Sequence, residues 1–130
     1  IYVDKKYPSL DSDYIVLRLP EMYLTRAEAS IMVNGSVSAT AVADVNMVRN
    51  RAGVTPIAGT PSTADMLEMI YNERSIELCF EYGDRFLNTR RLKKDIVAEG
   101  GNGTIPHSNY NELLVYPIPQ SEIDIHNLKR

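Results

Sequence analysis

Residues 20–53 read PEMYLTRAEASIMVNGSVSATAVADVNMVRNRAG, and this stretch carries the signals that decide the fold. Pro20 and Glu21 are typical of a first helical turn, because proline loses no hydrogen bond there and a carboxylate suits the positive end of the helix dipole. The Asn-Gly pair at 34–35 is typical of a left-handed helix end. We therefore expect a first helix from Pro20 to about Val33.

The second half of this stretch has clear helical periodicity. Its apolar residues recur at steps of four, four, three and four, and so share one face of a helix: Val37, Ala41, Val45, Val48 and Ala52. Gly53 ends this pattern. With small residues at their expected contact, the two helices have the proportions of a tetratricopeptide unit. One such unit cannot bury its outer faces alone, so we expect neighbours that this chain does not contain.

A third helix is predicted to begin after Ser62, which stands in capping-box spacing with Asp65, and to continue to about Tyr82, before Gly83. Its apolar residues divide between two faces. Leu67, Ile70, Tyr71, Leu78 and Tyr82 lie on one face, and Met66, Met69, Ile76 and Phe80 lie on the other. A helix with two apolar faces is expected to be packed on both sides, which again places part of the structure elsewhere.

The remaining segments add short strands and loops. Residues 14–19 form an apolar run that is either a short strand or the lead into the first helix, and residues 99–111 have the composition of an exposed loop. A strand-like run covers residues 113–118, and Pro119 opens a last helical turn. The predicted fold class is mainly α, with a tetratricopeptide-like pair, a third packed helix, short strands and long loops.

Length and composition set limits on the class of protein. The chain has 130 residues, 44% of them hydrophobic and 24% charged, which fits one domain with a packed core. A net charge of -3 lowers the prior for nucleic-acid binding. There is no signal peptide and no run of about 18 apolar residues. From these features and from the start at Ile1, we expect residues 1–130 to be a piece cut from a longer protein.

The densest ionisable cluster consists of Glu73, Arg74, Glu77, Glu81, Asp84 and Arg85. Carboxylates that repeat every four residues on a helix have a spacing that aims them at a common metal ion or substrate. However, Arg74 and Arg85 are expected on the same side as Glu81, where guanidinium groups pair with carboxylates and neutralise the site. The pattern therefore favours a half-buried ion-pair lattice that fixes the third helix against its neighbours.

Other chemistry-bearing residues lack the partners that a metal site or a catalytic site needs. His107 stands alone in a loop, and Glu122 with His126 has no third ligand nearby. Cys79, the single cysteine, is expected to be a small buried hydrophobe. No nucleophile elbow or phosphate-binding glycine loop occurs. We expect no cofactor, no metal and no enzymatic activity.

Two segments remain as candidates for recognition. The basic run 90–94 fits a lipid or nucleic-acid patch, but cations are also expected where a helix ends, and this second interpretation is favoured. Tyr110, between two asparagines, is the best exposed aromatic platform for a sugar ring or a base. Tyr71 and Tyr82 are expected in the core.

Four blocks of sequence, in order along nearly the whole chain, carry a family resemblance. They are Arg18 to Leu24 with Ala27-Glu28-Ala29; Val45-Asn46, Val48-Arg49 and Arg51-Ala52-Gly53; Glu73-Arg74, Glu77-Leu78, Phe80-Glu81, Gly83 and Arg85; and Pro117-Ile118-Pro119 with Glu122. This order resembles the carboxy-terminal part of the SusD/RagB family of nutrient-binding outer-membrane lipoproteins.

The resemblance implies that residues 1–130 are a single carboxy-terminal domain of a longer chain, with the fold of a SusD-like α-superhelix fragment. It also implies a function. The parent protein would sit on the outward face of the outer membrane, held only by a lipid anchor outside this segment. It would bind an oligosaccharide or another nutrient without converting it and dock onto a TonB-dependent SusC-like transporter. No position matches a sugar-binding motif, so the substrate-binding residues and the nutrient stay open. The alternative is a helical-repeat adaptor that binds a protein segment and no sugar.

Overall fold

The computed structural model describes residues 13, 16–97, 103–110, 115 and 117–126. These residues belong to two compact units, Ile1–Arg85 and Phe86–Arg130. Among the residues so described, no helix has the length and apolar character needed to cross a membrane.

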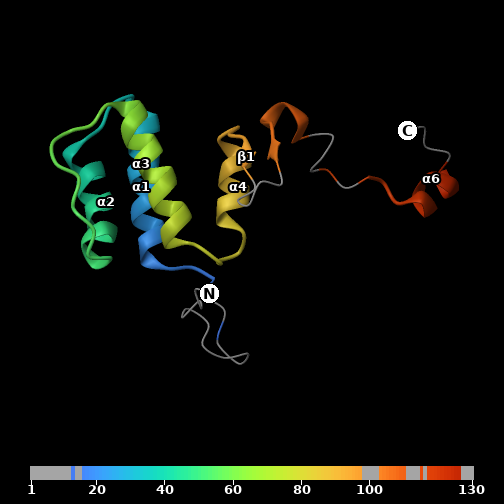
Figure 1. The fold of residues 1–130 in the computed structure, drawn as a ribbon, viewed down its shortest axis with the longest axis horizontal. Coiled ribbons are helices and arrows are strands. Elements are labelled where there is room, and N and C mark those ends of the chain that lie inside the picture. Colours follow the sequence, from blue (N-terminus) through green and yellow to red (C-terminus); the bar gives the residue numbers. More distant parts are fainter. Residues whose placement is uncertain (1–12, 14–15, 98–102, 111–114, 116, 127–130) are drawn as a thin grey trace. The chain divides into compact units, whose positions relative to one another are not determined.

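Three helices that lie side by side form the first unit: α1 (Leu19–Asn34), α2 (Ala39–Arg51) and α3 (Thr63–Glu77) (Figure 1). The N–H of Gly35 donates to the Ile31 carbonyl at the end of α1, with a left-handed φ of 68°. This confirms the predicted first helix and its left-handed end. The run before it is not a strand where it is described, because residues 16–18 form an irregular lead into α1.

The helix α2 begins at a serine cap, where the Ser38 hydroxyl accepts a hydrogen bond from the Ala41 N–H. Ala41, Val45 and Val48 of the predicted stripe are buried. Val37 packs against the core just before the helix. The spacing of apolar residues therefore identified the inner face of α2 correctly, except for Ala52, which follows the helix and is exposed.

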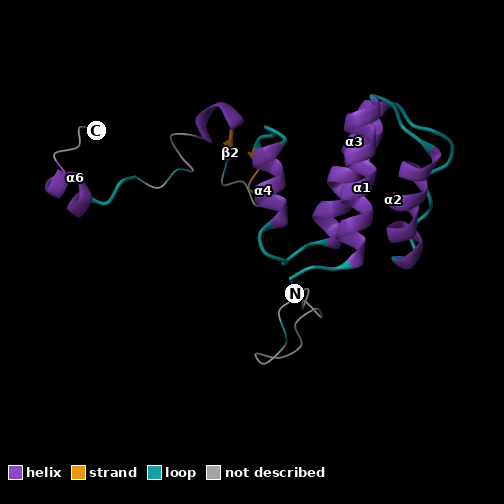
Figure 2. Ribbon diagram, turned by 180° about the vertical axis from the view of Figure 1, so that it is seen from behind, coloured by secondary structure: helices purple, strands orange, loops and turns teal. Residues whose placement is uncertain are grey.

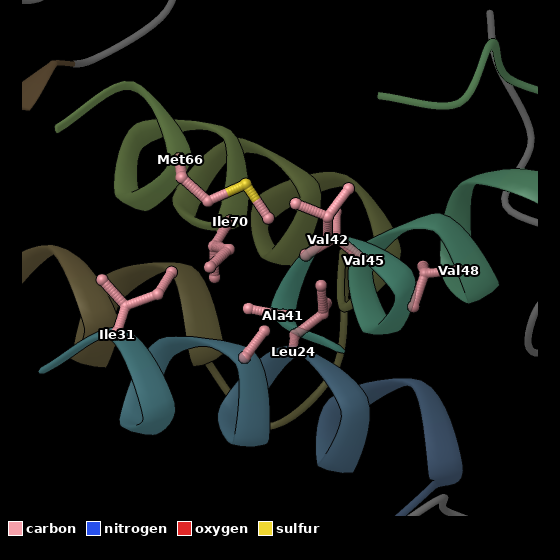
Figure 3. Close-up of a cluster of buried hydrophobic side chains, with 9 residues drawn as sticks. Leu24, Ile31, Ala41, Val42, Val45, Val48, Met66 and Ile70 are labelled. Carbon is pink, nitrogen blue, oxygen red and sulfur yellow. The ribbon is translucent and has the colours of Figure 1, made fainter. Parts of the chain in front are cut away.

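Buried aliphatic side chains from the three helices form one core (Figure 3). Its members are Leu24, Ala27 and Ile31 of α1, Ala41, Val42, Val45 and Val48 of α2, and Met66 and Ile70 of α3. Burial of each of the larger side chains contributes about 1.5–3 kcal/mol. The three helices thus hold one another in a fixed arrangement from which charged groups extend.

The predicted end of the third helix is wrong. Ser62 caps α3 as expected, with its hydroxyl accepting from the Asp65 N–H, but the helix ends at Glu77 rather than near Tyr82. Phe80 and Tyr82 take positive φ angles of 63° and 29° in the turn that follows. Neither residue type favours that conformation, so the sequence gives no local signal for the turn.

The second apolar face predicted for the third helix is largely exposed. Met66 is buried, but Ile76 and Phe80 each expose 74% of their surface in the part of the chain that the structure describes. Cys79 in the same turn is exposed as well, which corrects its expected burial. For Cys79 and Phe80 the reason is the turn, which takes residues 78–83 off the helical register, whereas Ile76 lies within α3 on a face that no described residue covers.

The last segments contain short elements (Figure 2). They are α4 (Asp84–Arg91), β1 (Ile96–Val97), β2 (Thr104–Ile105), the 3₁₀ helix η1 (His107–Asn109) and α6 (Gln120–His126). The strands pair antiparallel, with Ile96 opposite Ile105. The region expected to be a loop over 99–111 is therefore partly a hairpin strand and a helical turn, while α6 confirms the last predicted helix. Residues 14–15 and three of the six residues of the strand-like run at 113–118 lie outside the described residues, and the other three, 115, 117 and 118, are not in a strand.

Candidate functional site

An arginine that precedes α1 occupies the centre of the ion-pair cluster. The guanidinium of Arg18 donates to the carboxylates of Glu77 and Glu81, with a distance of 2.8 Å between Nε and the Glu81 Oε2. It also donates to the backbone carbonyl of Glu77, at the C-terminus of α3. One side chain thus pairs with two carboxylates and supplies a donor where the helix carbonyls have none.

Two arginines at the end of α2 reach the same face of α3. Arg51 donates to both oxygens of Glu77, at 2.5 and 2.6 Å. Arg49 donates to Glu73 at 2.8 Å and to the Thr55 carbonyl in the following loop. The carboxylates of α3 are therefore bound from α2 as well as from the chain before α1.

The remaining member of the cluster in α3 links three segments. Arg74 donates to the Asp84 carboxylate at 2.5 Å and to the Thr25 hydroxyl at 2.9 Å, and lies 3.5 Å from Glu21. In a separate pair, Arg26 of α1 donates to both oxygens of Asp44 in α2. Every helix of the first unit is thus joined to another by a charged contact.

The predicted lattice is confirmed, with different partners. Glu73, Arg74, Glu77, Glu81 and Asp84 are all buried, whereas Arg85 is exposed. Glu81 pairs with Arg18, which precedes α1 and is not among the expected partners. The guanidinium groups of Arg18, Arg49 and Arg51 were missed, although a charge inside the apolar run before Pro20 was a signal for the first of them.

Protonation in the cluster favours the ion pairs. Burial acts to lower the pKa of Arg18, but the hydrogen bonds to Glu81 and Glu77 outweigh it, so the pKa is raised. Burial, followed by the neighbouring Glu21 carboxylate, raises the pKa of the Tyr82 phenol above its usual value. The carboxylates are thus held by cations that do not lose their protons, an arrangement that fits a framework.

The expected aromatic platform is not exposed. Tyr110 is only 8% exposed, and its hydroxyl donates to the Lys94 carbonyl, which fixes the ring against the end of α4. Tyr71 is half-buried in α3, and Tyr82 lies in the turn after that helix. The expectation for Tyr110 failed because the β1–β2 hairpin and η1 return the chain toward α4.

No group of three potential ligands is placed for a metal ion among the residues that the structure describes. His107 has one carboxylate near its ring, that of Asp95, with 3.5 Å between Nδ1 and Oδ1. Glu122 lies in α6, and the side chain of His126 is outside the described part. These positions offer no set of ligands with metal-site geometry.

A cavity of about 580 Å³ lies in the second unit. It is open to solvent and is lined by Leu87, Arg90, Arg91, Lys93, His107 and Tyr110. The cations come from the end of α4 and the turn after it, and His107 and Tyr110 come from η1 and the residue that follows. This is the size of pocket in which proteins hold small ligands. The basic run, which the sequence indicated as a helix end, therefore also lines a cavity.

Backbone contacts fix the two sides of this cavity. The N–H of Lys94 donates to the Thr89 carbonyl and that of Lys93 to the Arg90 carbonyl, the two hydrogen bonds of a Schellman helix end. On the other side, the His107 N–H donates to the Asp95 carboxylate at 3.0 Å. The cationic and the aromatic walls thus meet through short, local connections.

Comparison with known proteins places the chain in a family. The model of the SusD family matches residues 5–127. The starch-binding protein SusD of Bacteroides thetaiotaomicron is 32% identical over 133 aligned positions, which cover 91% of this chain and 20% of that protein. The chain therefore spans about a fifth of the length of this relative.

A solved structure shows the same fold. It is a SusD superfamily protein from Parabacteroides distasonis, which is 24% identical and has a TM-score of 0.67. The match covers 88% of this chain and 26% of that one. This agreement supports the predicted fold class, a mainly helical SusD-like fragment. The family match, which runs through all four of the sequence blocks singled out above, shows that the chain belongs to the SusD family.

Proposed function

We propose that this chain is the carboxy-terminal domain of a longer protein that binds an oligosaccharide or another nutrient without converting it. The observation that carries this proposal is the family match over residues 5–127, together with a relative that is named as a starch-binding protein. In this account, residues 1–130 form one domain that supplies a framework and part of the ligand-binding surface.

The ion-pair cluster supports binding over catalysis. A catalytic carboxylate needs access to substrate and a pKa suited to proton transfer. Glu77 and Glu81 are instead buried and paired with Arg18. Groups held in this way keep the helices together and have no hydrogen-bonding capacity directed at a substrate.

The parent protein is proposed to act at the outward face of the outer membrane, held by a lipid anchor outside this segment. There it would dock onto a TonB-dependent SusC-like transporter and deliver its ligand. Exposed apolar side chains on α1, including Met22, Met32 and Val33, support a protein partner for this helix. The same exposure favours the second candidate function, a helical-repeat adaptor that binds protein but no sugar.

Isothermal titration of the full-length protein with a panel of neutral and acidic oligosaccharides separates the two candidates. A glycan that binds with a defined stoichiometry supports the proposed function. If no glycan binds while a transporter barrel or a peptide does, the adaptor is the correct assignment.

Docking is tested separately by co-purification of the full-length protein with its transporter. Val33→Glu, on the exposed part of α1, is expected to reduce recovery of the complex. Met47→Glu places the same charge at an exposed position of α2 and serves as the matched control. Equal recovery with both variants would remove α1 from the interface.

A further inference from the structure

The cavity of the second unit is cationic in a chain that is acidic overall. Four cations stand between residues 90 and 94, namely Arg90, Arg91, Lys93 and Lys94, and the first three of them line the cavity. The formal net charge of the chain is -3. Positive charge is therefore gathered at one cavity and is not a general property of the surface.

The cations of this cavity differ from the arginines of the first unit. Arg18, Arg49 and Arg51 each pair with a carboxylate. Among the described residues, neither Arg90 nor Lys93 has a carboxylate partner, and the guanidinium of Arg90 lies over the Phe86 ring, 5.7 Å from its centre. The N–H donors of Arg90 and Lys93 can therefore bind a ligand, whereas the paired arginines of the first unit already donate to carboxylates.

A second, independent observation concerns the backbone of Lys93. Its φ is 53°, at the helix-end position where glycine is the usual residue because it has no Cβ. A lysine there is strained, and strained residues that persist are concentrated at functional sites. The strain holds a flexible cationic side chain at the wall of the cavity.

The rest of the lining is apolar or aromatic. Leu87 is 56% exposed although it is a large aliphatic residue, and the Tyr110 ring is fixed by its hydrogen bond to the Lys94 carbonyl. A sugar ring has an apolar face that packs on an exposed aliphatic side chain such as that of Leu87. A carboxylate or sulfate on the same ring would accept two parallel hydrogen bonds from Arg90.

We propose that this cavity binds an acidic saccharide, one that carries a carboxylate or a sulfate, with Arg90 and Lys93 as the anion-binding groups. This inference rests on the proposed function and deepens it by naming the class of glycan. A neutral glycan would use the apolar wall but leave both cations without an ionic partner. An acidic glycan satisfies both parts of the lining.

The test is isothermal titration of the full-length protein with trigalacturonate and, as the neutral counterpart, maltotriose. Trigalacturonate is expected to bind more tightly, and Arg90→Gln is expected to weaken it at least about tenfold, the loss of a charged hydrogen bond. An increase from 50 to 500 mM salt, which screens charges, should weaken binding as well.

Two further variants separate a binding role from a structural one. Lys93→Gly relieves the positive φ, so its melting temperature should equal or exceed that of the parent while trigalacturonate binding falls about fivefold or more. Lys94→Gln removes a neighbouring charge whose side chain does not line the cavity, and should change binding less than about twofold. A merely structural Lys93 would give no loss of binding in the glycine variant.

The outcomes distinguish this inference from the proposed function. If maltotriose binds as well as trigalacturonate, or if Arg90→Gln has no effect, the acidic-saccharide site is wrong and the general function stands. Equally tight binding of inorganic sulfate, of anionic lipid vesicles or of single-stranded DNA would replace the saccharide by another anion and overturn the inference. If no glycan binds at all, both proposals fail.

Discussion

Arg18 closes the C-terminus of α3, because it donates to the backbone carbonyl of Glu77 as well as to its carboxylate. The two residues are 59 positions apart in the sequence. The contact joins the segment before α1 to the turn in which α3 ends, and Glu81, only 1% exposed, completes it from the far side of that turn. A single side chain therefore binds the end of the third helix and the turn that follows it.

Removal of this guanidinium should destabilise the first unit. Arg18→Met keeps much of the side-chain volume but leaves Glu77 and Glu81 buried without the Arg18 charge. We expect the free energy of unfolding to fall by about 3 kcal/mol, at the lower end for a broken buried ion pair, because 18% of the Arg18 side chain is exposed to water. Urea unfolding followed by circular dichroism measures this change.

The control is another ion pair of the same unit, in which the arginine is exposed. Arg26 binds both oxygens of the Asp44 carboxylate, but 63% of its side chain is exposed. Arg26→Met should therefore cost clearly less than Arg18→Met. Equal losses in the two variants would show that burial of the Arg18 contacts adds nothing.

The turn after α3 stores backbone strain at Phe80. Since its φ is 63°, glycine should be the better residue, and Phe80→Gly should be more stable than Phe80→Ala by about 1 kcal/mol. At Asn72, an exposed position inside α3, the order should reverse, with alanine more stable by about the same amount. Thermal unfolding of the four variants gives both differences, and alanine ahead of glycine at both positions would mean that Phe80 is unstrained.

A cavity made in the core should lower the free energy of unfolding. Leu24 is fully buried among all three helices, so Leu24→Ala should lower the free energy of unfolding by about 3 kcal/mol. Met32→Ala, on the exposed face of the same helix, should change it by less than about 0.5 kcal/mol. Urea unfolding of both variants tests whether α1 packs as described, and a small loss in Leu24→Ala would contradict that packing.

Stability should fall at alkaline pH through Tyr82. The pKa of its phenol is raised in the folded state, mainly by burial, so the neutral form is favoured there. The unfolded phenol ionises near its ordinary pKa of about 10, so the stabilisation is complete below that pH and is lost as pH rises beyond it. The free energy of unfolding of the parent should therefore fall relative to that of Tyr82→Phe between pH 9 and pH 11. A difference that is the same at both pH values would contradict the raised pKa.

Local signals in the sequence were sufficient for the helices of the first unit. The left-handed Gly35, the cap at Ser62 and the stripe through Val45 each act within four residues or repeat along one face. Such features are read without knowledge of the tertiary structure. They define the helix starts, one helix end and the inner face of α2.

Features that depend on distant residues were not predicted. The end of α3 is bound by Arg18, which is remote in sequence, whereas the apolar pattern alone predicts a helix that continues to Tyr82. The cavity in the second unit was not predicted either. The hairpin that brings His107 near α4 consists of strands of two residues each, which are too short to give a pattern in the sequence. The run of cations at residues 90–94 correctly predicted a helix end. It did not indicate that His107 and Tyr110 line the same cavity.

One experiment on the full-length protein shows whether it binds a glycan and leaves that glycan unchanged. The protein is titrated with trigalacturonate and maltotriose by calorimetry, and the glycan is then recovered after prolonged incubation and analysed by chromatography. We expect saturable binding of a glycan that is recovered intact. Binding of neither glycan nor any other member of the panel, or recovery of a cleaved or modified glycan, would contradict it.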